Sequence, residues 1–467
     1  MIVQVPHQAP RGEYPLLPSG FRFGTGTAAH QIEGAATEDG KGPSIPDTFA
    51  AEPGRIAEGS SGDVACDHDH RLAEDVALIK RLGARGYRFS FSWARIQATG
   101  SGPANPQGLD FYDRLIDSLL EAGVQPMATL HHGDLPQALG DHGGWLNRTT
   151  IDCFAEYAAM LGERYADRVE HWIPINEPNV VTMMGYSTGP HAPGRTMTFD
   201  ALPAAHHLLV AHGRAAIALR AAGSGSGGSA GREISVGCAN NHAPMWPASD
   251  EAADVGATKI YDALWNGMFL EPMLLGRYPA DLMPLFEEVI EPGDLATIRQ
   301  PLDFYGVNYY NPMKIGAAPD NAEMPFEFRE LLGYPTTDFG WPVVPDALRE
   351  WLIMFRARFR AALPPIMITG SGCSYAMGPD ADGIVDDQPR IDYLEAHLRA
   401  VATAIERGVD VRGYYAWSLL DNVDAATGYA QRFGLVHVDS ETQQRTPKRS
   451  FDWYAAMIAA QPASLVT

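Results

Sequence analysis

The stretch Pro365-Ile366-Met367-Ile368-Thr369-Gly370-Ser371-Gly372 is a short apolar run that ends in small and polar residues. A run of this kind is typical of a buried strand that opens into a loop. The same pattern recurs along the chain, and helix-length amphipathic segments lie between the runs. The expected strands are residues 21–27, 86–91, 125–130, 170–175, 234–239, 304–308, 366–369 and 413–417.

Helical periodicity fills the intervals between these strands. Residues 67–82 place Leu72, Val76 and Ile79 on one face, and residues 109–122 and 151–165 behave similarly. Eight strands that alternate with helices predict a single closed (β/α)8 TIM barrel, with an open doubly wound sheet as the alternative. No Gly-x-Gly-x-x-Gly follows the first strand, so a dinucleotide site is unsupported and no cofactor is expected.

Composition and charge restrict the partners of this chain. It has 467 residues and a net charge of −22, with no basic stripe, which argues against nucleic acid and anionic membrane surfaces. No apolar run approaches the ~18 residues of a membrane helix, and the N-terminus has no secretory pattern. We expect an extended arm over residues 1–18, a barrel over residues 19–467, and a cytoplasmic protein that binds a small molecule. A homo-oligomer is compatible with such a barrel.

Two local patterns have metal-binding or redox interpretations. Four scattered cysteines, none in a C-x-x-C pair, indicate neither a zinc site nor a disulfide framework, although Cys373 lies close to Gly370 and a reactive thiol is the alternative. Residues 67–70 read Asp-His-Asp-His at a helix start, where capping and a solvated surface are favoured over a metal site. Residues 221–231 are rich in Gly and Ser and predict a flexible surface loop.

The candidate functional residues follow the expected strands. Active sites of such barrels are built from the loops at the carboxyl ends of the strands. These positions hold Arg88 in the second strand, His132 after the third, Glu177 after the fourth, Asn240 after the fifth, Asn308 and Tyr310 after the sixth, Gly370 after the seventh and Trp417 at the end of the eighth.

Seven segments, taken in order, resemble glycoside hydrolase family one, the β-glucosidase family. They are residues 27–34 (TAAHQIEG), 39–45 (DGKGPSI), 87–93 (YRFSFSW), 129–136 (TLHHGDLP), 176–178 (NEP), 303–310 (DFYGVNYY) and 417–422 (WSLLDN). Matching segments extend from Phe23 to Tyr454, nearly the whole chain. The fold is strongly implied by this order, whereas function has to be argued from the site.

The resemblance implies a retaining mechanism with two carboxylates, one as acid/base and one as nucleophile. Glu177 takes the acid/base position, and Asn176 matches the residue that binds the sugar 2-hydroxyl. The remaining matches are Gln31 and His132 for the 3- and 4-hydroxyls, Asn308 for substrate binding, Trp417 for the aromatic floor under the sugar, and Arg88 and Tyr310 for the groups that hydrogen-bond the nucleophile.

The chain departs from the family pattern at the same pocket. The family segment Ile-Thr-Glu-Asn-Gly carries the nucleophile, and here that position is Gly370, a vacant nucleophile position. Asp424 stands where the family has a Glu, one methylene longer, that binds the 4- and 6-hydroxyls of the sugar. Tryptophans of the family are replaced by Pro46, Gly133 and Ala425. Because several neighbours differ together, a natural homologue with a re-purposed pocket is favoured over a single engineered change.

Three functional hypotheses follow. In the first, Glu177 acts as general acid/base on a glycoside or natural product without an enzyme nucleophile, and ordinary retaining hydrolysis is lost or negligible. In the second, the protein binds a sugar or metabolite without catalysis. In the third, it is an engineered glycosynthase-type variant. We also expect space for a water or anion beside Gly370, and an acidic partner such as Asp424 near Arg88.

Overall fold

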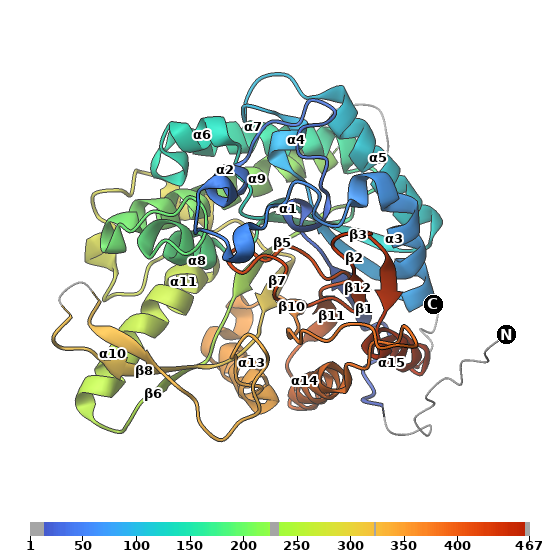
Figure 1. The fold of residues 1–467 in the computed structure, drawn as a ribbon. Coiled ribbons are helices and arrows are strands. Elements are labelled where there is room, and N and C mark those ends of the chain that lie inside the picture. Colours follow the sequence, from blue (N-terminus) through green and yellow to red (C-terminus); the bar gives the residue numbers. More distant parts are fainter. Residues whose placement is uncertain (1–13, 225–232, 322–323, 463–467) are drawn as a thin grey trace.

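Eight parallel strands form a closed barrel in the computed structural model, which describes residues 14–224, 233–321 and 324–462 (Figure 1). The order around the barrel is β1-β11-β10-β7-β5-β4-β3-β2. The strands are β1 (Arg22–Gly26), β2 (Gly86–Ser90), β3 (Gln125–His131), β4 (His171–Ile175), β5 (Ser235–Asn241), β7 (Phe304–Asn308), β10 (Ile366–Ser371) and β11 (Val411–Trp417). All eight expected strands and the (β/α)8 fold are confirmed.

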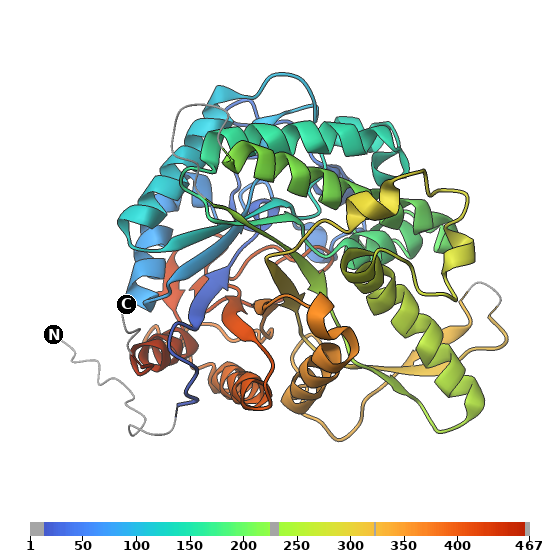
Figure 2. The ribbon, with the colours of Figure 1, turned by 180° about the vertical axis from the view of Figure 1, so that it is seen from behind.

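Long helices cover the outside of the barrel, and short helices such as α1 and α2 lie in the loops at its end (Figures 1 and 2). They are α1 (Ala29–Ile32), α2 (Ile45–Ala51), α3 (His68–Leu82), α4 (Trp93–Ile96), α5 (Pro106–Glu121), α6 (Gln137–Asp141), α7 (Thr149–Tyr165), α8 (Pro178–Val180), α9 (Leu202–Gly223), α10 (Ala252–Asp262), α11 (Met268–Leu275), α12 (Asp294–Ile298), α13 (Pro345–Phe359), α14 (Gln388–Glu406) and α15 (Arg449–Ala459). The three helical segments expected from periodicity correspond to α3, α5 and α7.

Small strands decorate the loops. One sheet contains β6 (Met245–Pro247), β8 (Met313–Ala317) and β9 (Phe326–Arg329), and a second contains β12 (Val436–Val438) and β13 (Arg445–Pro447).

Helix α5 shows how local sequence sets the boundaries of a helix. The Asn105 side chain accepts a hydrogen bond from the Gln107 N–H at 3.3 Å, and Pro106 occupies the first turn. Gly123 follows the helix with φ +77°, as expected of a stop.

The barrel interior is filled by alternate side chains of the strands. Six of them form an apolar cluster of their own: Met127, Ile173, Ala239, Phe304, Met367 and Tyr415. The strand period of two directs these residues inward while their neighbours pack against the helices. A packed interior leaves ligand space only beyond the strand ends, where the loops begin.

The Asp-His-Asp-His segment at the start of α3 is largely structural. His68 is buried and its Nδ1 lies 2.7 Å from Asp75, while the buried Asp69 accepts a hydrogen bond from Arg95 at 2.7 Å. The expectation of a solvated cap is therefore wrong for these two residues, because each one pairs with a buried charged residue. In the described part of the chain, no group of three or more His, Cys, Asp or Glu residues is arranged to hold a metal ion.

Other sequence expectations are settled in part. Residues 221–223 end helix α9, so they are not loop, and residues 225–232 lie outside the described residues. Residues 1–13 of the expected arm also lie outside them, whereas Leu17 is buried and its N–H donates to Gln461 at 3.0 Å. Cys373 is buried, and burial raises the pKa of its thiol to about 12, which disfavours the thiolate that the reactive-thiol alternative needs.

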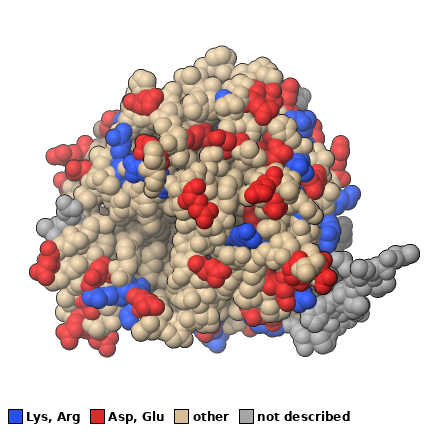
Figure 3. All heavy atoms as spheres, viewed as in Figure 1, with Lys and Arg blue, Asp and Glu red and all other residues tan. Residues whose placement is uncertain are grey.

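The surface carries acidic residues widely. Figure 3 shows Asp and Glu scattered over one face, around a hollow with mostly uncharged walls. Among the residues that the structure describes, no helix has both the length and the apolar character needed to cross a bilayer.

Candidate active site

A pocket of about 390 Å³ lies beyond the carboxyl ends of the barrel strands. Such a volume is typical of a small-molecule site. The structure places ten of the eleven predicted site residues on its wall: Gln31, Arg88, His132, Asn176, Glu177, Asn308, Tyr310, Trp417, Asp424 and Ala425. The eleventh, Gly370, is buried at the end of β10, behind Asn308 and Tyr310.

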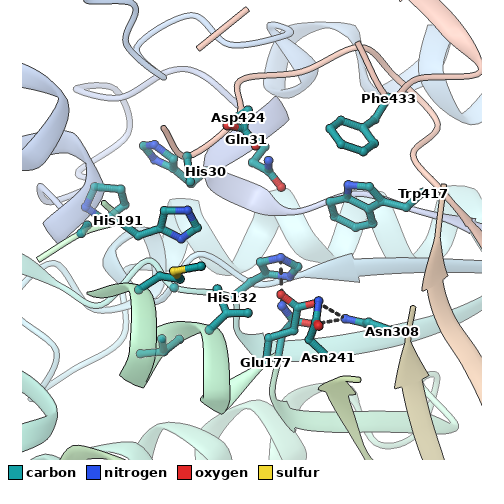
Figure 4. Close-up of a pocket in the computed structure, with 18 of the residues that line it drawn as sticks. His30, Gln31, His132, Glu177, His191, Asn241, Asn308, Trp417, Asp424 and Phe433 are labelled. Carbon is teal, nitrogen blue, oxygen red and sulfur yellow. Dashed lines mark hydrogen bonds between the residues drawn. The ribbon is translucent and has the colours of Figure 1, made fainter. Parts of the chain in front are cut away.

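Glu177 lies directly after β4 in a left-handed conformation with φ +47°. Its N–H donates to the Ala239 carbonyl at 2.7 Å, which fixes the turn. Its Oε1 accepts hydrogen bonds from the side-chain amides of Asn308 at 2.7 Å and Asn241 at 3.2 Å (Figure 4). Burial raises the pKa of this carboxyl, although the two amides and Arg88 partly oppose the rise. A carboxyl that keeps its proton to higher pH is suited to general acid catalysis.

Arg88 donates its hydrogen bonds to neutral oxygens. Its guanidinium donates to the Thr369 carbonyl at 2.8 Å, to Thr129 Oγ1 at 3.3 Å and to the Asn176 side-chain oxygen. Burial lowers its pKa to about 10, so it remains charged at neutral pH. The expectation that Asp424 pairs with Arg88 is wrong, because the Asp424 Oδ1 caps its own turn instead.

That turn uses one oxygen of the Asp424 carboxylate. Asp424 Oδ1 accepts from the N–H groups of Ala426 at 3.1 Å and Thr427 at 2.9 Å, and from the Thr427 hydroxyl at 2.6 Å. Asp424 and His191 both line the pocket, and the pKa of His191 is lowered by burial and raised in part by Asp424. The family resemblance implied that this carboxylate binds the 4- and 6-hydroxyls of a sugar. Asp424 cannot use both of its oxygens for that purpose unless the hydrogen bonds of its own turn are broken.

Asn308 and Tyr310 lie next to the position that a side chain at Gly370 would occupy. An ideal Cβ at Gly370 would lie 3.0 Å from Asn308 Oδ1 and 3.5 Å from the Tyr310 hydroxyl. The strand register shifts between Ile368 and Gly370, so Gly370 pairs with Asn308 across a bulge. The Thr369 hydroxyl donates to Asn308 Oδ1 at 2.7 Å and holds the amide there. Asn308 therefore borders the position of the missing side chain, and the space for a water or anion beside Gly370 stays a prediction.

A chain of hydrogen bonds fixes the tautomer of His132. Asn176 Oδ1 accepts from Arg88 and, at 3.0 Å, from Asn308, so the Asn176 amide nitrogen faces His132 Nε2 at 3.1 Å. That nitrogen of His132 must accept, and the proton of the neutral ring resides on Nδ1. Burial, followed by the charge of Arg88, lowers the pKa of His132 well below its ordinary value. The His132 ring stacks on Trp417 with a centroid separation of 5.6 Å.

Gln31 is anchored by its amide nitrogen. Its Nε2 donates to the Val423 carbonyl at 2.9 Å and to Asn422 Oδ1 at 3.2 Å. The amide oxygen of Gln31 is thereby turned to the opposite side of the amide group, where it can accept a hydrogen bond from a ligand hydroxyl.

The strand-end candidate Asn240 is a wrong prediction. Its amide is buried and donates to the Tyr305 hydroxyl at 2.7 Å, behind the barrel wall, whereas its neighbour Asn241 contacts Glu177. The alternation along β5 contained the signal. Ala239 points into the barrel, so Asn241, two residues further on, shares its side of the strand.

Other pocket residues were missed. They are His30, Phe49, His191, Phe339, Trp341 and Phe433. Phe339, Trp341 and Phe433 form an aromatic group in which neighbouring ring centroids lie 4.3 to 6.1 Å apart. Phe339 and Trp341 come from the long segment between β9 and α13, which has no periodicity that would have placed them at the site.

The fold and the pocket define a (β/α)8-barrel protein with a small-molecule site at its carboxyl-terminal rim. The model of the family described as glycosyl hydrolase family 1 matches residues 14–462, and the chain belongs to this family. It is 41% identical to Beta-glucosidase A of Thermotoga maritima over 95% of this chain and 97% of that protein. It is 42% identical to Beta-glucosidase of an Agrobacterium species, with 96% of each chain covered. The solved family 1 b-glucosidase from Thermotoga maritima has a TM-score of 0.90 with this structure, at 40% identity, and covers 96% of this chain and 99% of that one.

Proposed function

We propose that this chain is a β-glucosidase-like protein that acts on a glycoside or a sugar-containing natural product, with Glu177 as general acid/base and no enzyme nucleophile. The observation that carries this proposal is a carboxyl with a raised pKa at Glu177 combined with a glycine at position 370. The two-carboxylate mechanism needs a second carboxyl group about 5–5.5 Å from the first. A glycine cannot supply that group.

The reaction then proceeds through the groups that remain. Glu177 gives its proton to the leaving-group oxygen as the bond from that oxygen to the anomeric carbon breaks. Asn176 is positioned by Arg88 and Asn308 to hydrogen-bond the sugar. The new bond to the anomeric carbon comes from water, which releases its proton to the solvent from which Glu177 is reprotonated, or from a group of the substrate itself. Ordinary retaining hydrolysis is lost or negligible.

Non-catalytic binding of a sugar or metabolite is the second candidate function, and one observation favours it. Asn308 Oδ1 lies 3.0 Å from the Cβ position of Gly370, and its amide nitrogen donates to Glu177 at 2.7 Å. The same side chain thus narrows the path of an attacking group and stabilises the ionised acid. The engineered-variant alternative is tested separately, because it predicts coupling of an α-glycosyl fluoride to an acceptor and rescue by formate or azide.

The test is Glu177→Gln, measured on a panel of nitrophenyl β-glycosides and glycosylated natural products. The proposal expects at least one compound to be converted, and the variant to convert it at least about 100-fold more slowly, since general acid catalysis contributes about 10²–10⁴. Glu163→Gln, on the exposed face of α7, is the matched control and should convert it at the parental rate. Unchanged turnover in Glu177→Gln overturns the proposal, and saturable binding without conversion by the parent favours the second candidate.

A further inference from the structure

The pocket has two ends of different chemistry. Glu177, Asn241, Asn308 and His132 lie together at one end, as Figure 4 shows, and Gln31, His30 and Asp424 lie at the other. At the Glu177 end a carboxyl, amides and an imidazole converge on the same space. The other end is here called the Asp424 end.

Much of the hydrogen-bonding capacity at the Asp424 end is used inside the protein. The Gln31 amide nitrogen makes two hydrogen bonds to the chain, and Asp424 Oδ1 accepts three. His30 Nδ1 lies 3.4 Å from Asp47 Oδ1. The groups that remain for a ligand include one oxygen of Asp424, the Gln31 oxygen, the His191 ring and the Ser60 hydroxyl, which are enough to orient one or two hydroxyls of a ligand.

Apolar side chains line much of the wall around these groups, beside the polar Ser60 and His191. Pro46 and Phe49 of α2, Ile56 and Ala425 all line the pocket there. Apolar walls with few polar groups favour an apolar ligand group, because its transfer from water is favourable.

The same wall is closed by tight packing between two loops. The Ala57 N–H donates to the Ala426 carbonyl at 3.2 Å, which joins the loop after α2 to the turn that carries Asp424. A Cβ at Gly428 would lie 2.6 Å from Ser60 Oγ, and one at Gly62 would lie 2.9 Å from His30 Cε1. These contacts hold the two loops against each other, and the side chains of Pro46, Phe49, Ile56 and Ala425 form the pocket side of this wall.

We propose that the ligand is a sugar that carries an apolar acyl or aromatic group on its 4- or 6-hydroxyl, and that this group occupies the compartment formed by Pro46, Phe49, Ile56 and Ala425. The inference rests on the proposed function, which places the anomeric carbon beside Glu177. Carbon 4 of a pyranose lies across the ring from the anomeric carbon. Carbon 6 is attached to carbon 5, the ring neighbour of carbon 4. Substituents at these positions then point away from Glu177, toward the Asp424 end.

The inference is tested by calorimetric binding in the Glu177→Gln background, in which any turnover of the probes is slowed at least about 100-fold. The probes are glucose, glucose with an octanoyl ester on its 6-hydroxyl, and octyl β-glucoside, in which the apolar chain leaves from the anomeric oxygen. We expect the 6-octanoyl ester to bind at least about tenfold more tightly than glucose, since each methylene removed from water adds affinity. An ester that binds no more tightly than glucose overturns the inference.

Two tryptophan variants separate the two ends. Ala425→Trp fills the compartment and is expected to weaken binding of the ester at least about tenfold while octyl β-glucoside is little affected. Val181→Trp, on the wall that follows Glu177 in the chain, is expected to do the reverse. Equal losses for both probes in Ala425→Trp contradict the assigned compartment. Ala425→Leu, a smaller change, gives the same comparison if the tryptophan variant does not fold.

The outcomes also separate this inference from the proposed function. Tight, Ala425-dependent binding of the ester by a protein that converts no glycoside supports the compartment and rejects the catalytic role of Glu177. Conversion of glycosides that depends on Glu177, without preference for the ester, supports the catalytic role and rejects the compartment.

Discussion

Glu177 and Gly370 together determine what chemistry is open to this pocket. The carboxyl is held by two amides and raised in pKa by burial, and the position expected to bear the second carboxyl has no side chain. The consequence at residue scale is that proton donation is retained while covalent attack by the protein is not.

Restoring a carboxylate at position 370 should restore part of the retaining reaction. Gly370→Glu requires Asn308 to move by a few tenths of an ångström, because the new Cβ would otherwise lie 3.0 Å from Asn308 Oδ1. The backbone of Gly370 does not have a positive φ, so a side chain is tolerated there. We expect hydrolysis of nitrophenyl β-glucoside to rise at least about 100-fold above the parent, since loss of a nucleophile costs several orders of magnitude.

The control for this variant is Gly370→Gln, which adds similar bulk without a charge. Equal activity of the Glu and Gln variants would show that the added side chain acts by packing and not as a nucleophile.

Asn241 tunes the acid at Glu177. Its amide hydrogen bond stabilises the ionised carboxylate and lowers the pKa, against the larger effect of burial. Asn241→Leu should therefore raise the pKa of Glu177 further above its ordinary value. Carbon-13 NMR titration of the Glu177 carboxyl measures this directly, and an unchanged or lowered pKa in the variant would contradict the account.

At the scale of elements, buried ion pairs hold the loops that carry the site. Arg95 of α4 donates to Glu33, which follows α1, at 3.0 Å and to Asp69 of α3 at 2.7 Å. All three side chains are less than a tenth exposed. Glu33 lies two residues after Gln31, so this cluster also fixes the segment from which Gln31 reaches the pocket.

Arg95→Met leaves two buried carboxylates without their partner. Removal of one member of a buried ion pair typically costs about 3–5 kcal/mol. We expect the free energy of unfolding in urea to fall by about that amount. Arg81→Met, which removes an exposed pair with Asp452, is the control and should change it by less than about 1 kcal/mol. Equal effects of the two substitutions would contradict the role assigned to the cluster.

The elements could be predicted from the sequence better than the contacts between them. Eight apolar runs identified the barrel strands, and strand ends identified most of the pocket wall, because barrel loops converge at one rim. The position of Asn308 against Gly370 could not be predicted, since it depends on a bulge between β10 and β7. Trp341 and Phe339 reach the pocket from a loop whose path has no local signal. Asp424 was expected near Arg88, but a turn that it caps itself keeps it away.

At the scale of the whole molecule, stability should depend on pH from two sides. Neighbouring cations lower the pKa of Asp75 and Asp421 against the effect of burial. Their contribution is present above the unfolded pKa of about 4 and is lost as pH falls through the folded values. Burial raises the pKa of Asp134 to about 6. Its contribution is present below about pH 4 and is lost as pH rises through 6.

Asp134→Asn isolates the second effect. A rise of about two pKa units corresponds to roughly 3 kcal/mol of stability that the parent loses between pH 4 and pH 7. We expect the variant to lose less over this range than the parent when urea unfolding is measured at several pH values, with similar losses for both proteins below pH 4. Parallel curves for the two proteins from pH 4 to pH 7 would contradict the assigned titration.

The central claim is that the proton donor is in place while the protein supplies no attacking carboxylate. The most direct measurement is proton NMR of the sugar released from a simple aryl β-glucoside by the unmodified protein, which reports both the rate and the anomer formed first. The account predicts release barely above that of buffer alone. Rapid release in which β-glucose is the first product would contradict it.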